Sequence, residues 1–501
     1  MDVYVQAMEM VFRLDVFLTL LAGGAFGLFM GAMPGLTSTM AMALLVPVTF
    51  FLPPVPALAL MVAASSMAIF SGDLPGALMR IPGTPASAAY CEDTYYLTKT
   101  GRASIGLGLG LGASVVGGMA GALILSLSAP LLAKVALNFS SYEYFWLACL
   151  GLTCATLVSQ STAVKGLVSL LIGLLAATVG LDATTGFPRF TFGLTEMMGG
   201  ISFIPAMIGM FAVAELISTI LRNEKQATVP QYEMGSLWKV ISTRMWHHKA
   251  NAVRGSLIGT LVGALPGAGA DIAAWVSYAI AKKLSKKTEE FGKGTEEGIV
   301  AASSSNNSSI AGGWIPTLVF GIPGDSGAAI IIGVLYLKDL APGPTLFLYK
   351  PEVLYAVFAT FFIANILLFL MGTVMIKLSS HILKVPYGVL APCIMMFCVV
   401  GAFAMNNSYF GVAVMMAAGV LAWFMKGNGI PVAPAILGMV LGNLLEKNFL
   451  TSMVKANGDP LLFFSRPISA ALGIVTILIW CLQIYSSFKS GRRHQQNIGN
   501  L

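Results

Sequence analysis

Four proline–glycine breaks lie at matching places in the two halves of this chain, and they are the first places at which chemistry could occur. They are Pro34-Gly35, Pro82-Gly83, Pro266-Gly267 and Pro323-Gly324. Proline removes a backbone donor and glycine loosens the chain, so a helix broken there exposes N–H and C=O groups. In lipid these groups must be satisfied by protein or by a water-filled cavity. One such break is typical of a kink or a turn, whereas four at matching places indicate a transport site.

The residues that follow the breaks are small or hydroxylated, which lets a ligand approach the backbone. Free N–H groups and the positive end of a short helix favour a carboxylate or a phosphate. The pattern therefore predicts an anion with several acidic groups, held by helix ends rather than by an arginine cluster. The predicted substrate-binding residues are Pro34, Gly35, Thr37, Ser38, Arg80, Pro82, Gly83, Thr84, Pro266, Gly267, Gly269, Pro323, Gly324 and Ser326.

A run of serines and asparagines, Ser303–Ser309, adjoins the last break. Such a run is typical either of a surface loop or of a cavity lining, and its position just before the Ile322-Pro323-Gly324 break favours the lining. Amide and hydroxyl oxygens are plausible Na⁺ ligands. The predicted ion-coupling residues are Asp271, Asn306, Asn307 and Asp325.

Arg80 and Asp325 are charges inside apolar segments, where a charge is costly and indicates function. Each lies beside an Ile-Pro-Gly break, so we expect both near one symmetry axis at similar depth, where they could pair. One interpretation is a structural ion pair, or an Arg80 side chain that reaches the membrane interface. The other is that Arg80 binds a substrate carboxylate while Asp325 takes the coupling cation.

Enzyme motifs are missing from the sequence. The four histidines are His247, His248, His381 and His494, and no HExxH, nucleotide-binding glycine loop or Cys/His metal spacing occurs. The six cysteines form no CxxC, and we expect Cys149, Cys154, Cys393 and Cys398, which lie inside apolar segments, to be packing residues. The sequence therefore predicts no enzyme, no cofactor and no metal beyond a transported Na⁺.

The composition identifies the elements that must position these residues. Of 501 residues, 56% are hydrophobic and 10% charged, whereas a soluble protein carries about 25% charged residues. A helix needs roughly 20 apolar residues to cross a bilayer. We expect an all-α polytopic membrane protein with about 12 crossings, some of them broken or re-entrant. The candidate spans are 16–33, 56–79, 105–133, 144–160, 163–181, 199–221, 252–282, 308–338, 353–377, 386–405, 409–425, 432–446 and 467–488.

Three motifs occur twice in the same order, which predicts a duplication. Gly31–Gly35 is repeated at Gly263–Gly267, Ile81–Ala89 at Ile322–Ala329, and Pro205–Met210 at Pro434–Met439. We expect a first repeat over 1–221, a basic cytoplasmic linker over 222–254, a second repeat over 255–446, and an extra helix with a basic tail over 447–501.

The distribution of charge sets the orientation of the repeats. The net charge of +7 comes from a few loops, which is typical of cytoplasmic loops rather than of nucleic-acid binding. Linker and tail are both basic and should be cytoplasmic, so the two repeats should be inverted.

At these motifs the chain resembles the large membrane subunit of the tripartite tricarboxylate transporters (TctA-like) along nearly its whole length. The residues that carry the resemblance are Gly31–Phe50, Ile81–Ala89, Gly180–Gly186, Arg189–Gly193, Gly263–Tyr278, Glu297–Asn307, Gly312-Gly313, Gly321–Gly324, Pro434–Glu446 and Arg466–Ser469.

The resemblance implies a secondary transporter of the bacterial inner membrane that uses an H⁺ or Na⁺ gradient. It also implies two partners, a small membrane subunit and a periplasmic solute-binding protein that delivers a carboxylate such as citrate. A homodimer is one candidate assembly. A channel or facilitator for small organic anions without ion coupling is the alternative function, and a membrane enzyme acting on a lipid-linked substrate is a third.

The chain departs from the family's pattern at four places. Ala301-Ala302-Ser303 stands where relatives usually have Ala-Pro-Glu, and the segment Ser71-Gly72-Asp73-Leu74-Pro75 is unlike the usual Gly-Gly-Ser. Asp325 and Arg80 replace residues that are commonly uncharged. These departures put citrate as substrate in question, but not the transport class.

Overall fold

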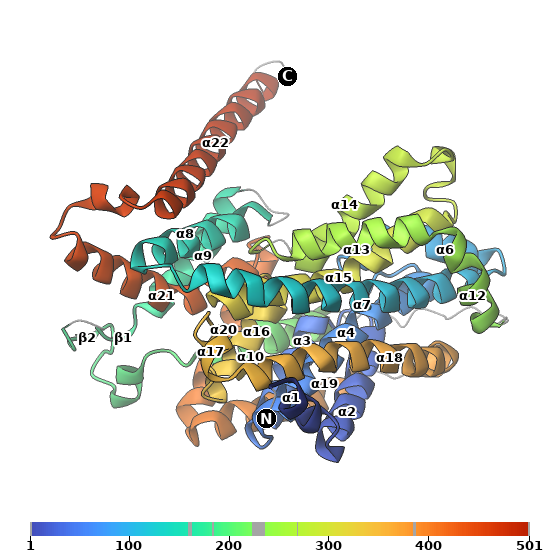
Figure 1. Ribbon diagram of the computed structural model, residues 1–501, viewed down its shortest axis with the longest axis horizontal. Coiled ribbons are helices and arrows are strands. Elements are labelled where there is room, and N and C mark those ends of the chain that lie inside the picture. The colour runs from blue at the N-terminus through green and yellow to red at the C-terminus, as the bar shows by residue number, and fades with distance from the viewer. Residues whose placement is uncertain are drawn as a thin grey trace. The chain divides into compact units, whose positions relative to one another are not determined.

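The computed structural model describes residues 3–158, 163–182, 185–222, 236–267, 269–383 and 387–498, and most of them are helical (Figure 1). Residues 223–235 of the predicted linker, Ala268 and the last residues of the tail lie outside this description. The helices up to residue 222 are α1 (Val3–Val11), α2 (Leu14–Ala32), α3 (Ser38–Phe50), α4 (Pro54–Ser71), α5 (Asp73–Met79), η1 (Ser87–Ala89), α6 (Cys91–Lys99), α7 (Ala103–Ala136), α8 (Ser141–Val158), α9 (Ala163–Ala177), η2 (Thr195–Gly199), α10 (Phe203–Ile208), the π-helical turn η3 (Gly209–Val213) and α11 (Ala214–Arg222).

The remaining helices follow the basic linker. They are α12 (Leu237–His247), α13 (Lys249–Gly263), α14 (Gly269–Leu284), η4 (Thr288–Glu290), α15 (Glu296–Phe320), α16 (Ser326–Leu337), α17 (Leu346–Tyr349), α18 (Pro351–Ile382), α19 (Tyr387–Asn406), α20 (Tyr409–Gly427), α21 (Ala433–Lys455), η5 (Pro460–Phe464) and α22 (Pro467–Ile498). Within the described residues the sheet content is one pair of two-residue strands, β1 (Gly180–Leu181) and β2 (Pro188–Arg189).

The predicted all-α membrane class is confirmed. Six helical segments among the described residues are long and apolar enough to cross a bilayer: Leu14–Ala32, Pro54–Met79, Ala103–Ala136, Phe203–Leu221, Pro351–Ser379 and Tyr409–Gly427. Five shorter apolar helices accompany them, among them Ser38–Phe50 and Ser326–Leu337. Both of these short helices begin directly after a Pro-Gly break, which is how a broken crossing would be built.

Two helix boundaries differ from the predicted spans. The span predicted to begin at residue 308 starts as α15 at Glu296, so the polar run lies inside a helix. Helix α3 is missing from the predicted spans because its 13 residues are fewer than a bilayer crossing requires, and because Pro47 lies inside it.

The chain forms two compact units, each of which draws on both halves of the sequence. Unit 1 contains Met1–Lys134 and Ser202–Phe424, and unit 2 contains Val135–Ile201 and Met425–Leu501. All four Pro-Gly breaks belong to unit 1. In unit 2, α21 packs against α8 and α9, and α22 packs against α8.

Two helix pairs form the interior of unit 1, and glycines bring each pair into backbone contact. On α2 every fourth residue from Gly23 to Gly31 is glycine, and a Cβ at any of them would overlap the backbone of α4. On α13 the same spacing from Gly255 to Gly263 faces the backbone of α15. In lipid, where apolar side chains gain little by leaving the solvent, such close approach is the main source of helix association. We call these two contacts the glycine seams.

Candidate functional site

The breaks of the second half meet in unit 1. The backbone N–H of Gly267 donates a hydrogen bond of 2.6 Å to the carbonyl oxygen of Gly324, so the turn after α13 is joined to the turn after α15. The backbone of Gly324 also packs against Gly313 so closely that a Cβ would not fit. This contact explains why glycine is needed there, and it places the first turns of α14 and α16 near each other.

A break of the first half joins them through α14. The indole N–H of Trp275 donates to the carbonyl oxygen of Pro85 at 3.3 Å, and the backbone N–H of Ala86 is hydrogen-bonded to the Asp271 carboxylate. The residues that follow Pro82-Gly83 therefore pack on the first two turns of α14. Helix α3, which follows the remaining break, packs against α16.

The helix starts beyond three breaks have different caps. Thr37 accepts a hydrogen bond from the N–H of Met40 at the start of α3. Asp325 accepts one from the N–H of Ala328, at 2.7 Å, at the start of α16. Thr84 and Ser87 cap one another, since each backbone N–H donates to the other side-chain oxygen at 3.1 Å. Asp325 is thus held as a helix cap, and this explains its side-chain position without a bound ligand.

The predicted substrate-binding residues differ in exposure. Gly35, Arg80 and Pro82 are exposed, and a second group is partly exposed. The partly exposed residues are Pro34, Thr37, Ser38, Pro266, Gly267 and Ser326; Gly83, Thr84, Gly269, Pro323 and Gly324 are buried. The first and third breaks are therefore the more accessible ones.

Of the alternatives for Arg80, the ion pair with Asp325 does not form. The Nε of Arg80 donates to Glu92 at 2.9 Å, and both side chains are more than half exposed. Arg80 has a left-handed φ of 61° at the end of α5, which turns its side chain toward α6 rather than toward the start of α16. The ionisable side chain near Asp325 is that of Asp271. Both are carboxylic acids, so they cannot form an ion pair.

The polar run Ser303–Ser309 occupies the middle of α15, and all seven of its residues are buried. The surface-loop alternative is therefore wrong. Several hydroxyls are satisfied locally; that of Ser304 donates to the carbonyl of Val300 at 2.8 Å, and that of Ser309 to the carbonyl of Asn306 at 2.7 Å. Within the described residues, the side-chain oxygens of Ser303, Asn306 and Asn307 have no hydrogen-bond partner.

One buried acid was not among the predicted site residues. Asp73, only 5% exposed, begins α5 and accepts a hydrogen bond of 2.6 Å from the hydroxyl of Tyr90. The amide nitrogen of Asn306 donates to the same hydroxyl at 3.4 Å. Asp73 is the one acid in the predicted span 56–79, so the rule that a charge within a membrane span indicates function would have found it.

A second buried acid, Asp93 on α6, anchors a loop outside the membrane-spanning segments. Its Oδ1 accepts hydrogen bonds from the N–H groups of Gly292, Gly294 and Thr295, and its Oδ2 accepts one from the hydroxyl of Tyr278 at 2.6 Å. Burial raises the pKa of Asp93, and these four donors oppose that shift. The arrangement ties α6 to the loop before α15 and has a structural role.

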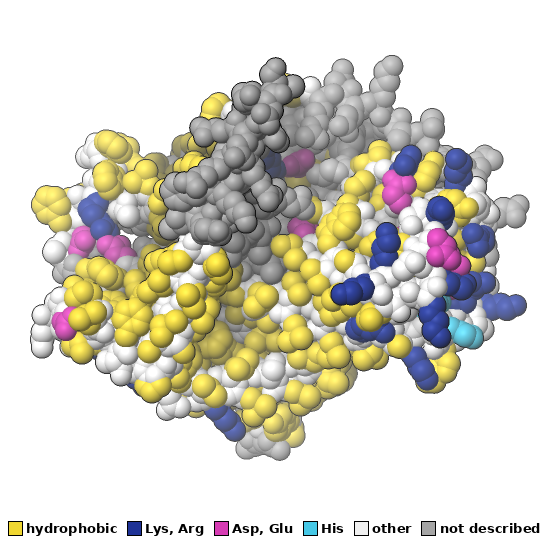
Figure 2. Space-filling model, turned by 90° about the horizontal axis from the view of Figure 1, so that it is seen from above, with side chains coloured by type: hydrophobic (Ala, Val, Ile, Leu, Met, Phe, Trp, Pro, Cys, Tyr) yellow, Lys and Arg dark blue, Asp and Glu magenta, His cyan; other side chains and the backbone are white. Residues whose placement is uncertain are grey.

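Exposed lysines and arginines gather at the same end of unit 1. Figure 2 shows them on the face that carries the ends of α12 and α14. They are Lys239, Arg244, Lys249, Lys282, Lys283, Lys286, Lys287 and Lys293. Arg244 and His248 both contact Glu296 in the first turn of α15, and these contacts lower the pKa of Glu296.

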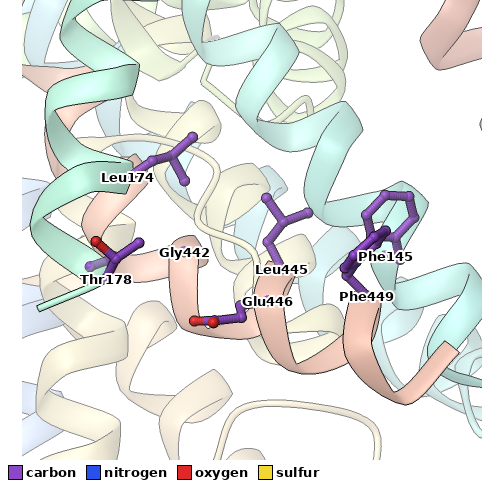
Figure 3. Close-up of a pocket in the computed structure, with 8 residues that line it drawn as sticks. Phe145, Leu174, Thr178, Gly442, Leu445, Glu446 and Phe449 are labelled. Carbon is purple, nitrogen blue, oxygen red and sulfur yellow. The ribbon is translucent and has the colours of Figure 1, made fainter. Parts of the chain in front are cut away.

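Unit 2 contains a pocket of about 400 Å³ that is lined almost entirely by apolar side chains (Figure 3). Its lining residues are Phe145, Leu174, Ala177, Thr178, Gly442, Leu445, Glu446 and Phe449. Glu446 binds Arg189 through two hydrogen bonds of 2.6 and 3.1 Å. Its carboxylate is therefore neutralised by an arginine, and the pocket offers little to an anion. Among the described residues, no group of three His, Cys, Asp or Glu side chains could hold a metal ion.

Comparisons with known proteins give a consistent result. Residues 17–437 match the sequence model of the tripartite tricarboxylate transporter TctA family. The chain is similar to two proteins of Agrobacterium vitis. One is described as an uncharacterized 52.8 kDa protein in the TAR-I ttuC' 3' region, 34% identical over 471 residues, which are 94% of this chain and 93% of the relative. The other, an uncharacterized protein in the TAR-II ttuC' 3' region, is 35% identical over 238 residues, which are 48% of this chain and 97% of the relative. No solved structure matches the chain.

Proposed function

Because the chain belongs to the tripartite tricarboxylate transporter TctA family, we propose that it is the large permease subunit of a binding-protein-dependent secondary transporter. A cation gradient drives the uptake of a (tri)carboxylate such as citrate or a related organic acid. The subunit works in the bacterial inner membrane with a small membrane subunit and a periplasmic solute-binding protein.

The observation that carries this proposal is the convergence of the breaks in unit 1. The hydrogen bond between Gly267 and Gly324 holds two interrupted helices together. Three helices, α3, α14 and α16, begin directly after these breaks. The first N–H groups of a helix have no partner within the helix itself. Carboxylate groups are the natural ligands of such helix ends. Gly35 and Gly267, which precede α3 and α14, are also accessible to a ligand.

The two structural repeats are supported by matching local geometry. Gly35 and Gly267 share a φ of 83°. Arg80 and Gly321 are both left-handed at the ends of their helices, and the residue after each donates to the proline carbonyl six positions earlier, from Ile81 to Pro75 and from Ile322 to Pro316. The glycine seams repeat the same four-residue spacing on α2 and α13.

A reciprocal contact extends the match to the other helices. Gly209, in the first half of the chain, lies against the carbonyl of Met415 in the second half. Gly438, in the second half, lies against the carbonyl of Leu170 in the first. Each half of the chain therefore supplies a helical segment whose glycine packs against the backbone of a helix from the other half. Together with the basic linker and tail, this pattern supports inverted repeats.

A screen of reconstituted uptake tests the proposal. The full chain, its small subunit and its binding protein are placed in proteoliposomes, and radiolabelled carboxylates are supplied under an imposed Na⁺ or H⁺ gradient. Accumulation above the outside concentration, lost when the gradient is dissipated, is the expected result. Uptake that only equilibrates across the membrane, whatever the gradient, would show the alternative function of a facilitator.

A further inference from the structure

The Asp73 carboxylate is buried without a protein cation to balance it. It lies where α4 gives way to α5, in an apolar segment, and is 5% exposed. Its Oδ1 accepts a hydrogen bond from Tyr90, but no Lys, Arg or His among the described residues forms an ion pair with it. A buried charge in a membrane protein is kept only where something compensates it.

One oxygen of this carboxylate and two neighbouring side-chain oxygens lack a hydrogen-bond partner within the described residues. They are Asp73 Oδ2, Ser303 Oγ and Asn306 Oδ1. Their residues converge from separate elements. Tyr90 contacts both Asp73 and Asn306 through its hydroxyl. A Cβ at Gly110 of α7 would lie 3.8 Å from both Asp73 Oδ2 and Ser303 Oγ, so the missing side chain at Gly110 leaves those two oxygens facing one small space. Ser303 and Asn306 are 0% and 1% exposed.

We propose that Asp73, Ser303 and Asn306, with Tyr90 as the residue that positions the carboxylate, form a binding site for one dehydrated Na⁺ ion. The site's role in coupling rests on the transport function proposed above. This site shares Asn306 with the predicted ion-coupling residues, but it lies apart from Asp271 and Asp325, because it is beside α7 and the middle of α15.

The chemistry of the donors selects the ion. Carboxylate, hydroxyl and amide oxygens are hard ligands, which suit Na⁺, Mg²⁺ or Ca²⁺ rather than a transition metal. A single carboxylate balances one positive charge, so a divalent ion would leave net charge in the membrane interior. A proton on Asp73 Oδ2 could pair with only one neighbouring oxygen. A monovalent cation in the space beside Gly110 would contact Asp73 Oδ2 and Ser303 Oγ together, with Asn306 Oδ1 as the third proposed ligand.

Binding is measured on the purified full chain in detergent. The melting temperature is recorded in NaCl and in KCl or choline chloride of equal ionic strength, and ²²Na⁺ binding is measured directly. For the wild type we expect a higher melting temperature in NaCl than in KCl or choline chloride. Asp73→Asn should abolish the rise and the ²²Na⁺ binding. Ser303→Ala should raise the half-saturating Na⁺ concentration by about tenfold, the effect of one lost ligand worth about 1.4 kcal/mol.

Ser304→Ala is the matched control, because the neighbouring hydroxyl is buried but already bonded to the carbonyls of Val300 and Ala301 in its own helix. It should leave Na⁺ binding unchanged. A wild type without a Na⁺-specific response overturns the proposal, as does unchanged binding in Asp73→Asn; if that variant fails to fold, unchanged half-saturation in Ser303→Ala overturns it. Proton-driven uptake without Na⁺ binding would refute this site and leave the proposed function standing. Na⁺ binding without uptake of any carboxylate would refute the proposed function and leave the site standing.

Discussion

Gly35 and Gly267 have the same left-handed backbone and stand just before the helices α3 and α14. A φ of 83° favours glycine, since a side chain in the left-handed region costs roughly 1–2 kcal/mol. Accessibility gives these glycines a second possible role, because a ligand can approach a backbone that carries no side chain. Substitution can separate the two roles.

Gly35→Val and Gly267→Val should abolish carboxylate uptake, because valine is both strained at this φ and bulky. Asparagine tolerates the left-handed region, so Gly35→Asn and Gly267→Asn should fold and insert normally yet still transport poorly. Uptake is measured in proteoliposomes, and folding by size-exclusion chromatography in detergent. Wild-type uptake by both asparagine variants would mean that the glycines serve only the turn.

Two departures from the family's pattern meet in space. They are the segment Ser71–Pro75, which contains Asp73, and the segment Ala301–Ser303. In the structure both side chains face the position of Gly110. The carboxylate of this small cluster therefore comes from α5, and the hydroxyl of Ser303 faces the same space from α15.

A double variant can move the carboxylate to the other side of the cluster. Asp73→Ser alone should lower uptake by about tenfold or more, the factor that about 1.4 kcal/mol produces, because the cluster loses its only carboxylate. Adding Ser303→Glu should restore a large part of the uptake, since the charge returns from the α15 side. Initial uptake rates of the single and double variants at equal protein amounts check this. A double variant no better than Asp73→Ser would show that the two positions act independently.

At the scale of the elements, the glycine seams determine how α2 and α4, and α13 and α15, pack. Gly27→Ala would overlap the backbone of Ala64, and Gly259→Ala that of Ser305. Each should lower the free energy of unfolding by about 1–3 kcal/mol through overpacking. Gly388→Ala, within α19, is the control because nothing lies near its Cβ position. Melting temperatures in detergent should fall for the first two variants and stay unchanged for the third.

Much of the helical architecture could be predicted from apolar run length, because lipid leaves helices as the only economical backbone for such runs. The Pro-Gly breaks were also predictable, and α13 and α15 end close to them. The helical state of Ser303–Ser309 could not be predicted, because its polar composition resembles a loop and only burial between α7 and α13 explains it. The partner of Arg80 could not be predicted either, since it depends on a left-handed φ that no local pattern indicates.

At the scale of the whole molecule, the orientation of the two halves is open to a direct test. In a cysteine-free background, Lys239→Cys on α12 should react with a membrane-impermeant thiol reagent only from the cytoplasm. Lys455→Cys at the end of α21 should react only from the periplasm. Both side chains are exposed, as the reagent requires. Cytoplasmic reaction at both positions would contradict inverted repeats and favour parallel ones.

The glycine seams also have a mechanical consequence. Two helices in backbone contact along their length cannot slide past each other without separating. Such a pair therefore resists bending more than two helices that are free to slide. The α2–α4 and α13–α15 pairs are therefore rigid elements of unit 1. Any deformation of that unit concentrates where the chain leaves these pairs, and three of those places are the breaks Pro34-Gly35, Pro266-Gly267 and Pro323-Gly324. The stiffest and the most compliant parts of the unit are direct neighbours in the sequence.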